Sequence, residues 1–538
     1  MCRAPGFLCP HFAAYCLFAA NIDGVETRER GETMELKVFR DTLSTMASLC
    51  ETKAELPIET EILIPDYLPQ VFKIVKCFVY LVTLQKQITA GRLTVEGYLR
   101  CVVYYQAEED QSLCQTEQKI PFTRAMDLPE SNYQGYTAQV SGEVEYLNCR
   151  AVNQRRVDVR GAYALSALVT AQSDQEIITA LADCGVEQKM LPVTGVKSVA
   201  NLDKLMTAEE ELTLPSQPQA ILDISGVGQV EEIKMISGKA VIKGKIKVEL
   251  TYRSQPGYRL EGAAKDVPFN QIIDLDGVPD DGVCFAEVEM VGCTMMATAG
   301  QEAGNTLTVT AILHLRVYRP VECYVVGDAF STQYKADVTY KTVNAEQLQE
   351  QLDKTVEADV AGALPDENAE IIGCFVSLHP LEWGQAEGGL TLGGRASAHV
   401  LCMNSLGEID CYDKAFEYSL PGVYPGTAEQ YRFECWPGVT AVNTQKNGMD
   451  MTAQVNIRVR GLLFRRIKET IVDSVTCDEA LEVGEPDVAL RIYYAAAGEN
   501  VFDIAKFYHV SPAAMMKLNH LEDLELGAGA RLLVPMTV

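Results

Sequence analysis

Residues Lys239–Tyr252 read KAVIKGKIKVELTY, and this stretch decides the class of fold. Its apolar residues recur at even steps, at Ala240, Ile242, Ile246, Val248 and Leu250. The positions between them carry charge, at Lys243, Lys245, Lys247 and Glu249. A period of two predicts a β-strand that buries one face and leaves the other in water. Gly244 interrupts the apolar face, which indicates a bulge or the close approach of a neighbouring backbone.

Related stretches recur along the chain with a single offset. An apolar-proline step stands at Ile64-Pro65, Leu214-Pro215 and Leu364-Pro365, and both intervals (215 − 65 and 365 − 215) are 150 residues. Val159-Arg160-Gly161-Ala162 has counterparts at Val309-Thr310-Ala311-Ile312 and Val459-Arg460-Gly461-Leu462. Gly97 precedes Pro121-Phe122 by the interval that separates Gly244 from Pro268-Phe269. Several independent anchors that hold one offset predict a triplicated domain.

The predicted fold is mainly β: three tandem β-rich repeat domains of about 150 residues, followed by a small βααβ domain. The expected boundaries are a start-site artefact or disordered leader at 1–33, a leader segment at 34–55, the repeats at 56–200, 201–350 and 351–485, and the last domain at 486–538. Asn344–Asp359 has helix-forming composition, so its type is left open between helix and strand.

Composition and charge exclude several classes of partner. The chain has 538 residues, 47% of them hydrophobic, and a formal net charge of −28. Such a balance opposes binding to nucleic acid, whose affinity comes from Lys and Arg that replace counterions, and docking on anionic lipid. The 17 cysteines form no C-x-x-C motif and predict a reducing, cytoplasmic compartment. No apolar run reaches the roughly 18 residues of a membrane span.

The first residues admit two interpretations. Arg3 and the apolar run Phe12–Ala20 are faintly similar to an export signal, but Pro5, Gly6 and Pro10 interrupt the pattern. Alternatively, translation starts at Met34, which we favour.

After Pro486 the pattern changes to strand, helix, helix, strand. Arg491–Tyr494 is strand-like, and Asn500 can cap a helix whose apolar stripe is Val501, Ile504, Ala505 and Tyr508. Ser511-Pro512 has the order of a cap followed by proline in the first helical turn. Gly527 and Gly529 precede a last strand, Arg531–Val534.

This tail resembles a LysM domain. The motif residues are Tyr494, the run Gly498–Ala505, the run Tyr508–Ser511, Asn519 and the run Leu526–Pro535. The resemblance implies a groove for N-acetylglucosamine glycans, such as peptidoglycan, between two loops. The residues that it assigns to these loops are Gly498, Glu499, Asn500, Val501, Asn519, Leu521 and Leu526.

The three repeats together with this tail resemble the SPOCS-domain, SipL-like sporulation proteins of spore-forming clostridia. The third repeat departs from the pattern, with Ala415-Phe416 in place of Pro-Phe. The resemblance implies a non-enzymatic scaffold of the endospore coat, located in the mother cell at the forespore surface. Its LysM domain is then expected to dock onto a morphogenetic ATPase of the stage IV sporulation protein A type, with Phe502 and Tyr508 as candidate contacts if they are partly exposed. The alternative is an exported, cell-envelope protein whose LysM domain binds peptidoglycan.

The sequence predicts no catalytic residues, no metal site and no cofactor. His314 lies in an apolar strand, which favours a packed role over a ligand role. His379, His399, Cys374 and Cys402 are zinc-ligand types, but their spacing matches no established pattern. An enzyme is retained only as an unrecognised active site within a repeat.

Overall fold

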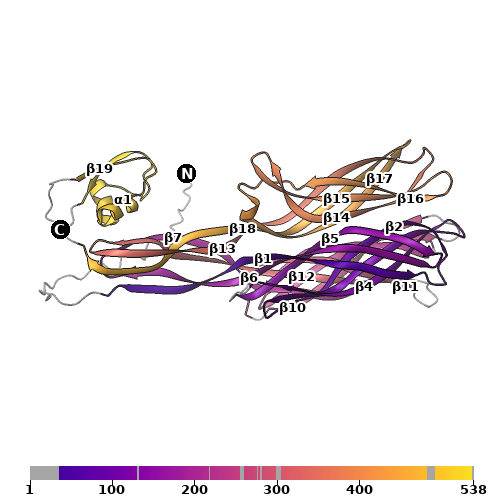
Figure 1. Ribbon diagram of the computed structural model, residues 1–538, viewed down its shortest axis with the longest axis horizontal. Helices are drawn as coiled ribbons and strands as arrows, with labels where there is room; N and C mark the ends of the chain where they lie inside the picture. The colour runs from indigo at the N-terminus through magenta and orange to yellow at the C-terminus, as the bar shows by residue number, and fades with distance from the viewer. Residues whose placement is uncertain are drawn as a thin grey trace, which may run out of the picture.

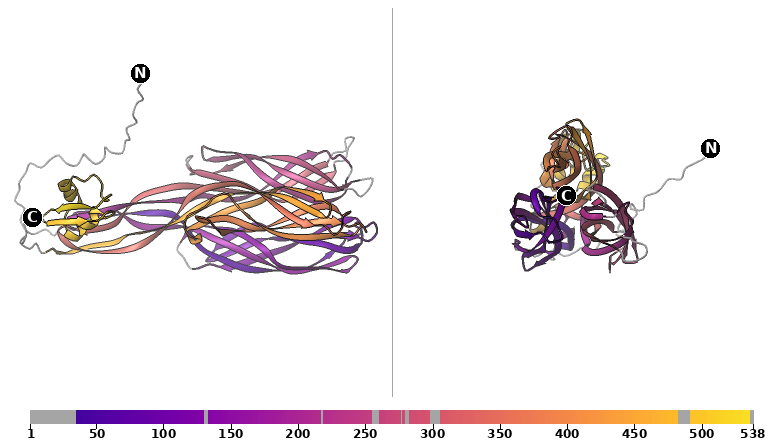
Figure 2. Two further views of the ribbon diagram at one scale, coloured as in Figure 1. Left: turned by 90° about the horizontal axis from the view of Figure 1, so that it is seen from above. Right: turned by 90° about the vertical axis from the view of Figure 1, so that its right-hand side faces the viewer.

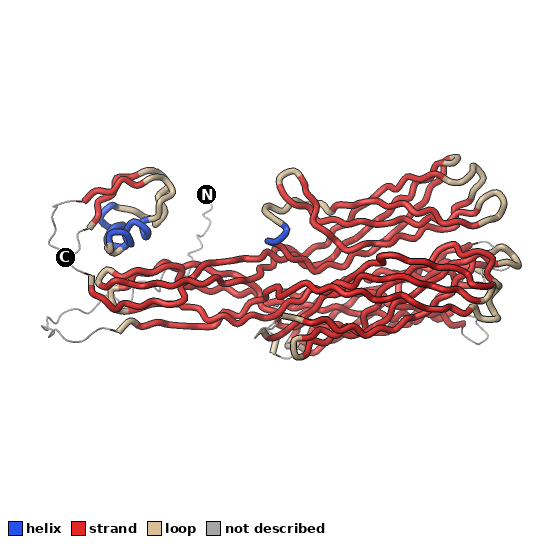
Figure 3. Tube along the Cα trace, viewed as in Figure 1, coloured by secondary structure: helices blue, strands red, loops and turns tan. Residues whose placement is uncertain are grey.

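The computed structural model describes residues 35–129, 133–216, 218–254, 260–275, 277–278, 282–297, 305–481 and 491–535. The leader at 1–33, including the run that is similar to an export signal, lies outside the described residues. β-Strands dominate the described chain, and the two α-helices belong to the C-terminal domain (Figure 3). The prediction of a mainly β fold is confirmed.

The repeats are three six-stranded units built on one plan. The first contains β1 (Lys37–Leu63), β2 (Val71–Thr89), β3 (Arg92–Ala107), β4 (Leu113–Asp127), β5 (Gln134–Asn153) and β6 (Arg156–Ala182). The second contains β7 (Val186–Leu212), β8 (Pro218–Ile236), β9 (Lys239–Ser254), β10 (Leu260–Asp274), β11 (Val283–Ala297) and β12 (Asn305–Ser331). The third contains β13 (Tyr334–Ala363), β14 (Glu370–Ala386), β15 (Gly389–Met403), β16 (Ile409–Ser419), the 3-10 helix η2 (Ala428–Gln430), β17 (Tyr431–Asn447) and β18 (Asp450–Ala480).

Each unit pairs its strands into two antiparallel three-stranded sheets. The orders are β2-β3-β4 with β1-β6-β5, then β10-β9-β8 with β11-β12-β7, and β14-β15-β16 with β13-β18-β17. The two sheets of one unit enclose an apolar core of their own. We call the part of each unit that surrounds this core the head. The strand that decides the fold, Lys239–Tyr252, lies in β9 at the middle of its sheet, with its alternate residues buried as the pattern predicts. The three heads surround a common axis (Figure 2).

The first and last strands of every unit stay paired beyond the head as a long two-stranded ribbon. These three ribbons, β1–β6, β7–β12 and β13–β18, pack together into a stalk on one side of the heads (Figure 1). One buried apolar layer of the stalk takes a residue from each of the six strands: Leu43, Ile177, Val193, Val325, Val343 and Ile471. β18 has 31 residues, so at roughly 3.3 Å per residue it spans about 100 Å.

Two segments are clarified by these pairings. Asn344–Asp359 is part of strand β13, because its residues pair with β18 along their length and bury Leu352. Tertiary pairing here overrides a composition that suits a helix. Residues 37–55 belong to β1 and pair with β6, so the first unit as the strands define it begins upstream of residue 56.

The glycine of the repeated strand lies where a neighbouring backbone approaches closely in the first two units. A Cβ on Gly97 would stand 2.1 Å from the carbonyl oxygen of Val82, and one on Gly244 would stand 2.2 Å from that of Gln229. In both places the partner strand carries a bulge. Both features that the sequence indicated are therefore present.

In each repeat an aromatic residue of the neighbouring strand pairs with that glycine. Phe122 pairs with Gly97 and Phe269 with Gly244. In the third unit Tyr418 pairs with Gly394, while Phe416 lies further along the strand opposite Ala396. The substitution of Ala415-Phe416 for Pro-Phe thus accompanies a change of the ring that covers the glycine.

We predict that Gly244→Ala destabilises the second unit by about 1–3 kcal/mol, because the added methyl group must push apart two paired backbones. Gly262→Ala is the matched control in the neighbouring strand β10, since its Cβ would have its nearest neighbour 4.0 Å away. Chemical denaturation of the two variants measures the difference. Equal stability would contradict the close approach at Gly244.

Candidate binding site in the C-terminal domain and the junction of the repeats

The C-terminal domain folds in the predicted order of strand, helix, helix and strand. It contains β19 (Arg491–Ala495), α1 (Val501–Tyr508), α2 (Pro512–Asn519) and β20 (Ala530–Val534), and the two strands pair antiparallel. Asn500 caps α1, because its Oδ1 accepts a 2.8 Å hydrogen bond from the backbone N–H of Phe502. Pro512 is the first residue of α2, as the Ser511-Pro512 step predicted.

The two loops assigned to glycan binding lie side by side. The backbone N–H of Gly498 donates to the carbonyl oxygen of Leu526 at 2.7 Å. The backbone N–H of Leu526 donates to the carbonyl oxygen of Glu499 at 3.0 Å. A third bond, from the N–H of Val501 to the carbonyl oxygen of Leu524, measures 2.7 Å. These bonds bring three of the predicted residues, Gly498, Glu499 and Val501, close to a fourth, Leu526.

Most side chains of these loops form hydrogen bonds within the domain or are buried in it. Asn519 donates to the carbonyl oxygens of Met515 and Leu533 and accepts from the N–H of Leu533, so it joins α2 to β20. Glu499 accepts from the hydroxyl of Tyr493 and from the N–H of Ala496. The buried residues are Val501 and Leu526, and the half-buried one is Leu521. The main apolar side chain left at the rim is Leu524, which is 39% exposed.

The two candidate partner contacts differ in accessibility. Phe502 is 2% exposed, and its ring centroid lies 5.2 Å from that of Phe330 in the stalk, so it does not meet the condition of partial exposure. Tyr508 is half-buried between Tyr493 and Phe507, with the guanidinium of Arg491 5.2 Å from its ring centroid.

Helix α1 holds the domain against the end of the stalk. Lys506 Nζ lies 2.6 and 2.8 Å from the two carboxylate oxygens of Asp328, which also accepts from the hydroxyl of Tyr340. Burial acts to lower the pKa of Lys506, but the hydrogen bond and charge of Asp328 outweigh it and raise that pKa. A second contact joins the His509 ring to the carbonyl oxygen of Ser331 at 3.2 Å.

Two exposed aromatic residues were not predicted as partner contacts. Phe507 and Tyr494 are each 75% exposed. The signal for Phe507 was readable, because it lies in α1 but outside the apolar stripe Val501, Ile504, Ala505 and Tyr508. An aromatic side chain off the buried stripe of a short helix is a candidate for contact with another molecule.

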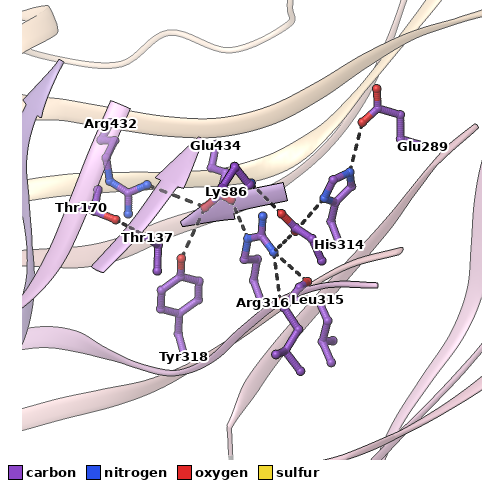
Figure 4. A network of polar contacts seen from close by, with 12 residues as sticks. Lys86, Thr137, Thr170, Glu289, His314, Leu315, Arg316, Tyr318, Arg432 and Glu434 are labelled. Carbon is purple, nitrogen blue, oxygen red and sulfur yellow. Dashed lines mark hydrogen bonds and ion pairs between the residues drawn. The ribbon is translucent and has the colours of Figure 1, made fainter. Parts of the chain in front are cut away.

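A second cluster of polar side chains takes residues from all three units (Figure 4). Arg316 of β12 is 2% exposed, and its Nε donates to Glu434 of β17 at 2.6 Å. Its Nη1 donates to Asp203 of β7 at 2.9 Å. Asp203 also pairs with Lys86 of β2 at 2.6 Å, so charges from all three units meet here.

The histidine expected to be packed is buried, and it also belongs to this polar network. His314 is buried, with Nδ1 2.8 Å from Asp203 and Nε2 3.2 Å from Glu289. It lies beside a cavity of about 750 Å³ whose lining includes residues of all three units.

A neighbouring pair completes the junction in the third unit. Arg432 donates to Glu346 at 2.8 Å, and Glu346 also accepts from the hydroxyl of Ser48 in the first unit. Burial acts to raise the pKa of Glu434, but the charges of Arg316 and Arg432 outweigh it and lower that pKa. Each carboxylate named here faces a cation, an arrangement suited to locking the units in register.

The side chains of His379, His399, Cys374 and Cys402 do not converge on one site. His399 and Cys402 are three residues apart in β15, so their side chains point to opposite faces of the sheet. His379 Nδ1 instead lies 2.6 Å from Glu143 in the first unit.

Comparison with known proteins supports the resemblance of the repeats. Residues 70–152 and 217–296 match the family model described as SipL, SPOCS domain. The matched segments cover β2–β5 of the first unit and β8–β11 of the second. No curated protein matches the chain, and no solved structure does. Among the described residues, no helix is long and apolar enough to cross a membrane.

We predict that Glu434→Gln destabilises the chain by about 3–5 kcal/mol, because it leaves the buried charge of Arg316 without its main counterion. Glu479→Gln is the control, since Glu479 and Lys335 form an ion pair whose side chains are 76% and 75% exposed. Its removal is expected to change stability by about 0–1 kcal/mol.

Chemical denaturation measures both effects. The double variant Arg316→Met with Glu434→Leu should recover most of the loss, since it removes both charges together. A similar small effect for Glu434→Gln and Glu479→Gln would contradict the locking role.

Proposed function

We propose that this chain is a non-enzymatic scaffold of endospore coat assembly, located in the mother cell at the forespore surface. Its C-terminal domain would be a LysM module that docks onto a morphogenetic ATPase of the stage IV sporulation protein A type. The match of two units to the SPOCS domain supports a role in sporulation. The βααβ order and the motif residues from Tyr494 to Pro535 support the LysM assignment.

The observation that carries the docking proposal is the position of the C-terminal domain. It lies at the end of the stalk away from the heads (Figure 1). One side of α1, with Phe502 and Lys506, is occupied by the stalk, whereas Phe507 stays exposed. A spacer with a binding module at one end and three heads at the other suits an adaptor between two assemblies.

The alternative is an exported protein whose LysM domain binds the N-acetylglucosamine glycan of peptidoglycan. The adjacent loops at 498–501 and 519–526 favour it, because they would form the groove. Against it, Asn500, Asn519 and Glu499 direct their polar atoms into the domain. Exposed Phe507 and Tyr494 agree better with a protein partner, since aromatic anchors dominate such interfaces.

We predict that the full-length chain retains the ATPase from a lysate of sporulating cells, identified by mass spectrometry, and that Phe507→Ala with Tyr494→Ala weakens retention at least tenfold. Both side chains are exposed, so the fold and melting temperature should be unchanged. Deletion of 487–538 should abolish retention while the three repeats still fold. Leu524→Asp, at the rim of the glycan loops, is the matched control and should retain the ATPase.

The same proteins are tested in parallel against insoluble peptidoglycan. Binding to peptidoglycan that Leu524→Asp removes, without retention of the ATPase, would overturn the scaffold proposal and support the envelope alternative.

A further inference from the structure

Three unlike metal-binding groups converge on one face of the sheet β14-β15-β16. His399 Nδ1, Cys411 Sγ and an Asp413 carboxylate oxygen all lie within 4.8 Å of one another. Nδ1 is 2.7 Å from Asp413 Oδ1, and Sγ is 3.5 Å from the same oxygen. This cluster lies outside the C-terminal domain and outside the junction network.

Strand pairing fixes the positions of the three groups. His399 of β15 is directly opposite Asp413 of β16, and Cys411 precedes Asp413 by two residues, so it shares the same face. Rigid strands hold ligand atoms more reliably than loops do. The sequence signal was Cys411-Tyr412-Asp413 in an alternating strand, but its partner His399 could not be assigned without the register.

The groups around the cluster orient it as the surroundings of a metal site do. His399 Nε2 is 3.0 Å from the hydroxyl of Ser377, which leaves Nδ1 to face Cys411 and Asp413. The other oxygen of Asp413 pairs with Lys76 of β2, in the first unit. Hydrogen bonds to the remote atoms of ligating histidines and carboxylates are typical of metal sites. The ring of Phe78 lies 5.0 Å from that of His399 and forms an apolar wall.

The site has both an enclosed side and an exposed side. His399 is 7% exposed, whereas the side chain of Asp413 is 53% exposed. His399, Lys76 and Ser377 also line a cavity of about 1340 Å³ between the units.

We propose that His399, Cys411 and Asp413 bind one Zn²⁺ ion at the contact between the first and third units. Nitrogen, sulfur and oxygen donors together suit this borderline-soft cation, and three protein ligands leave a fourth position for water. With Zn–N and Zn–O near 2.0 Å and Zn–S near 2.3 Å, tetrahedral ligands are about 3.3–3.5 Å apart. The distance from Sγ to Oδ1 already fits, and the imidazole must move away from the carboxylate by about half an ångström.

Binding displaces the thiol proton, since the thiolate is the ligand. Thiolate and carboxylate together neutralise the two charges of the ion, while neutral His399 adds none. The ion would join β15 to β16 within the third unit, while Lys76 of the first unit stays on the outer oxygen of Asp413.

The test is a titration of the reduced, full-length chain with Zn²⁺ in competition with a chromophoric chelator. We expect one tight equivalent per chain, which Cys411→Ser and His399→Gln each weaken at least tenfold. Cys477→Ser is the matched control, because Cys477 is also half-buried but lies in the stalk, and it should bind like the unaltered chain. Ser377→Ala should weaken binding about 10- to 100-fold through the loss of an orienting hydrogen bond.

Co²⁺ provides a readout that a loss of stability alone would not mimic. The unaltered chain and Cys477→Ser should show a thiolate-to-cobalt charge-transfer band, which Cys411→Ser should lack. Because Asp413 is exposed, Asp413→Asn should fold normally without metal. Its affinity for Zn²⁺ should nevertheless fall at least tenfold. Two results would overturn the proposal. One is a zinc affinity within twofold of the unaltered chain in both Cys411→Ser and Asp413→Asn, and the other is an unchanged cobalt band in Cys411→Ser.

Discussion

The buried ion pair between Arg316 and Glu434 is the constraint on which the arrangement of the heads depends. Each head has its own apolar core, so burial of apolar surface within a unit does not determine how the units face one another. Arg316 is fully enclosed and must keep its counterions, which come from the second and third units. Because an unpaired buried charge is costly, this pairing disfavours displaced arrangements of the units, in addition to the apolar clusters that they share.

The stalk shows how a repeated sequence makes a common core and where it departs from symmetry. Leu43, Val193 and Val343 are equivalent residues at intervals of 150, and they share one apolar layer. At the next equivalent positions, Met46 and Val196 are apolar but the third is Glu346, which pairs with Arg432. Glu346 thus makes one side of the junction polar, so the third unit is not equivalent to the other two there. The C-terminal domain then docks on the second unit through Asp328 and Phe330.

The proposed scaffold role and the proposed zinc site belong to different parts of the molecule. The first concerns the exposed side of α1, at the end of the stalk, and the second concerns β15 and β16 in the third head. All three zinc ligands lie in β15 and β16, so loss of zinc would not touch the docking helix. A partner that binds the C-terminal domain could therefore be retained by a chain whose heads have lost the ion.

The sequence by itself determined the triplication, the strand character of Lys239–Tyr252, the close approach at its glycine and the order of elements in the last domain. These follow from local periodicity and from repeated anchors, which one chain displays without any knowledge of its contacts. Tertiary structure alone decided that Asn344–Asp359 is a strand, that Phe502 is covered by the stalk and that His399 meets Cys411 and Asp413. Each depends on which strand or domain lies opposite, a long-range choice that residue spacing does not encode.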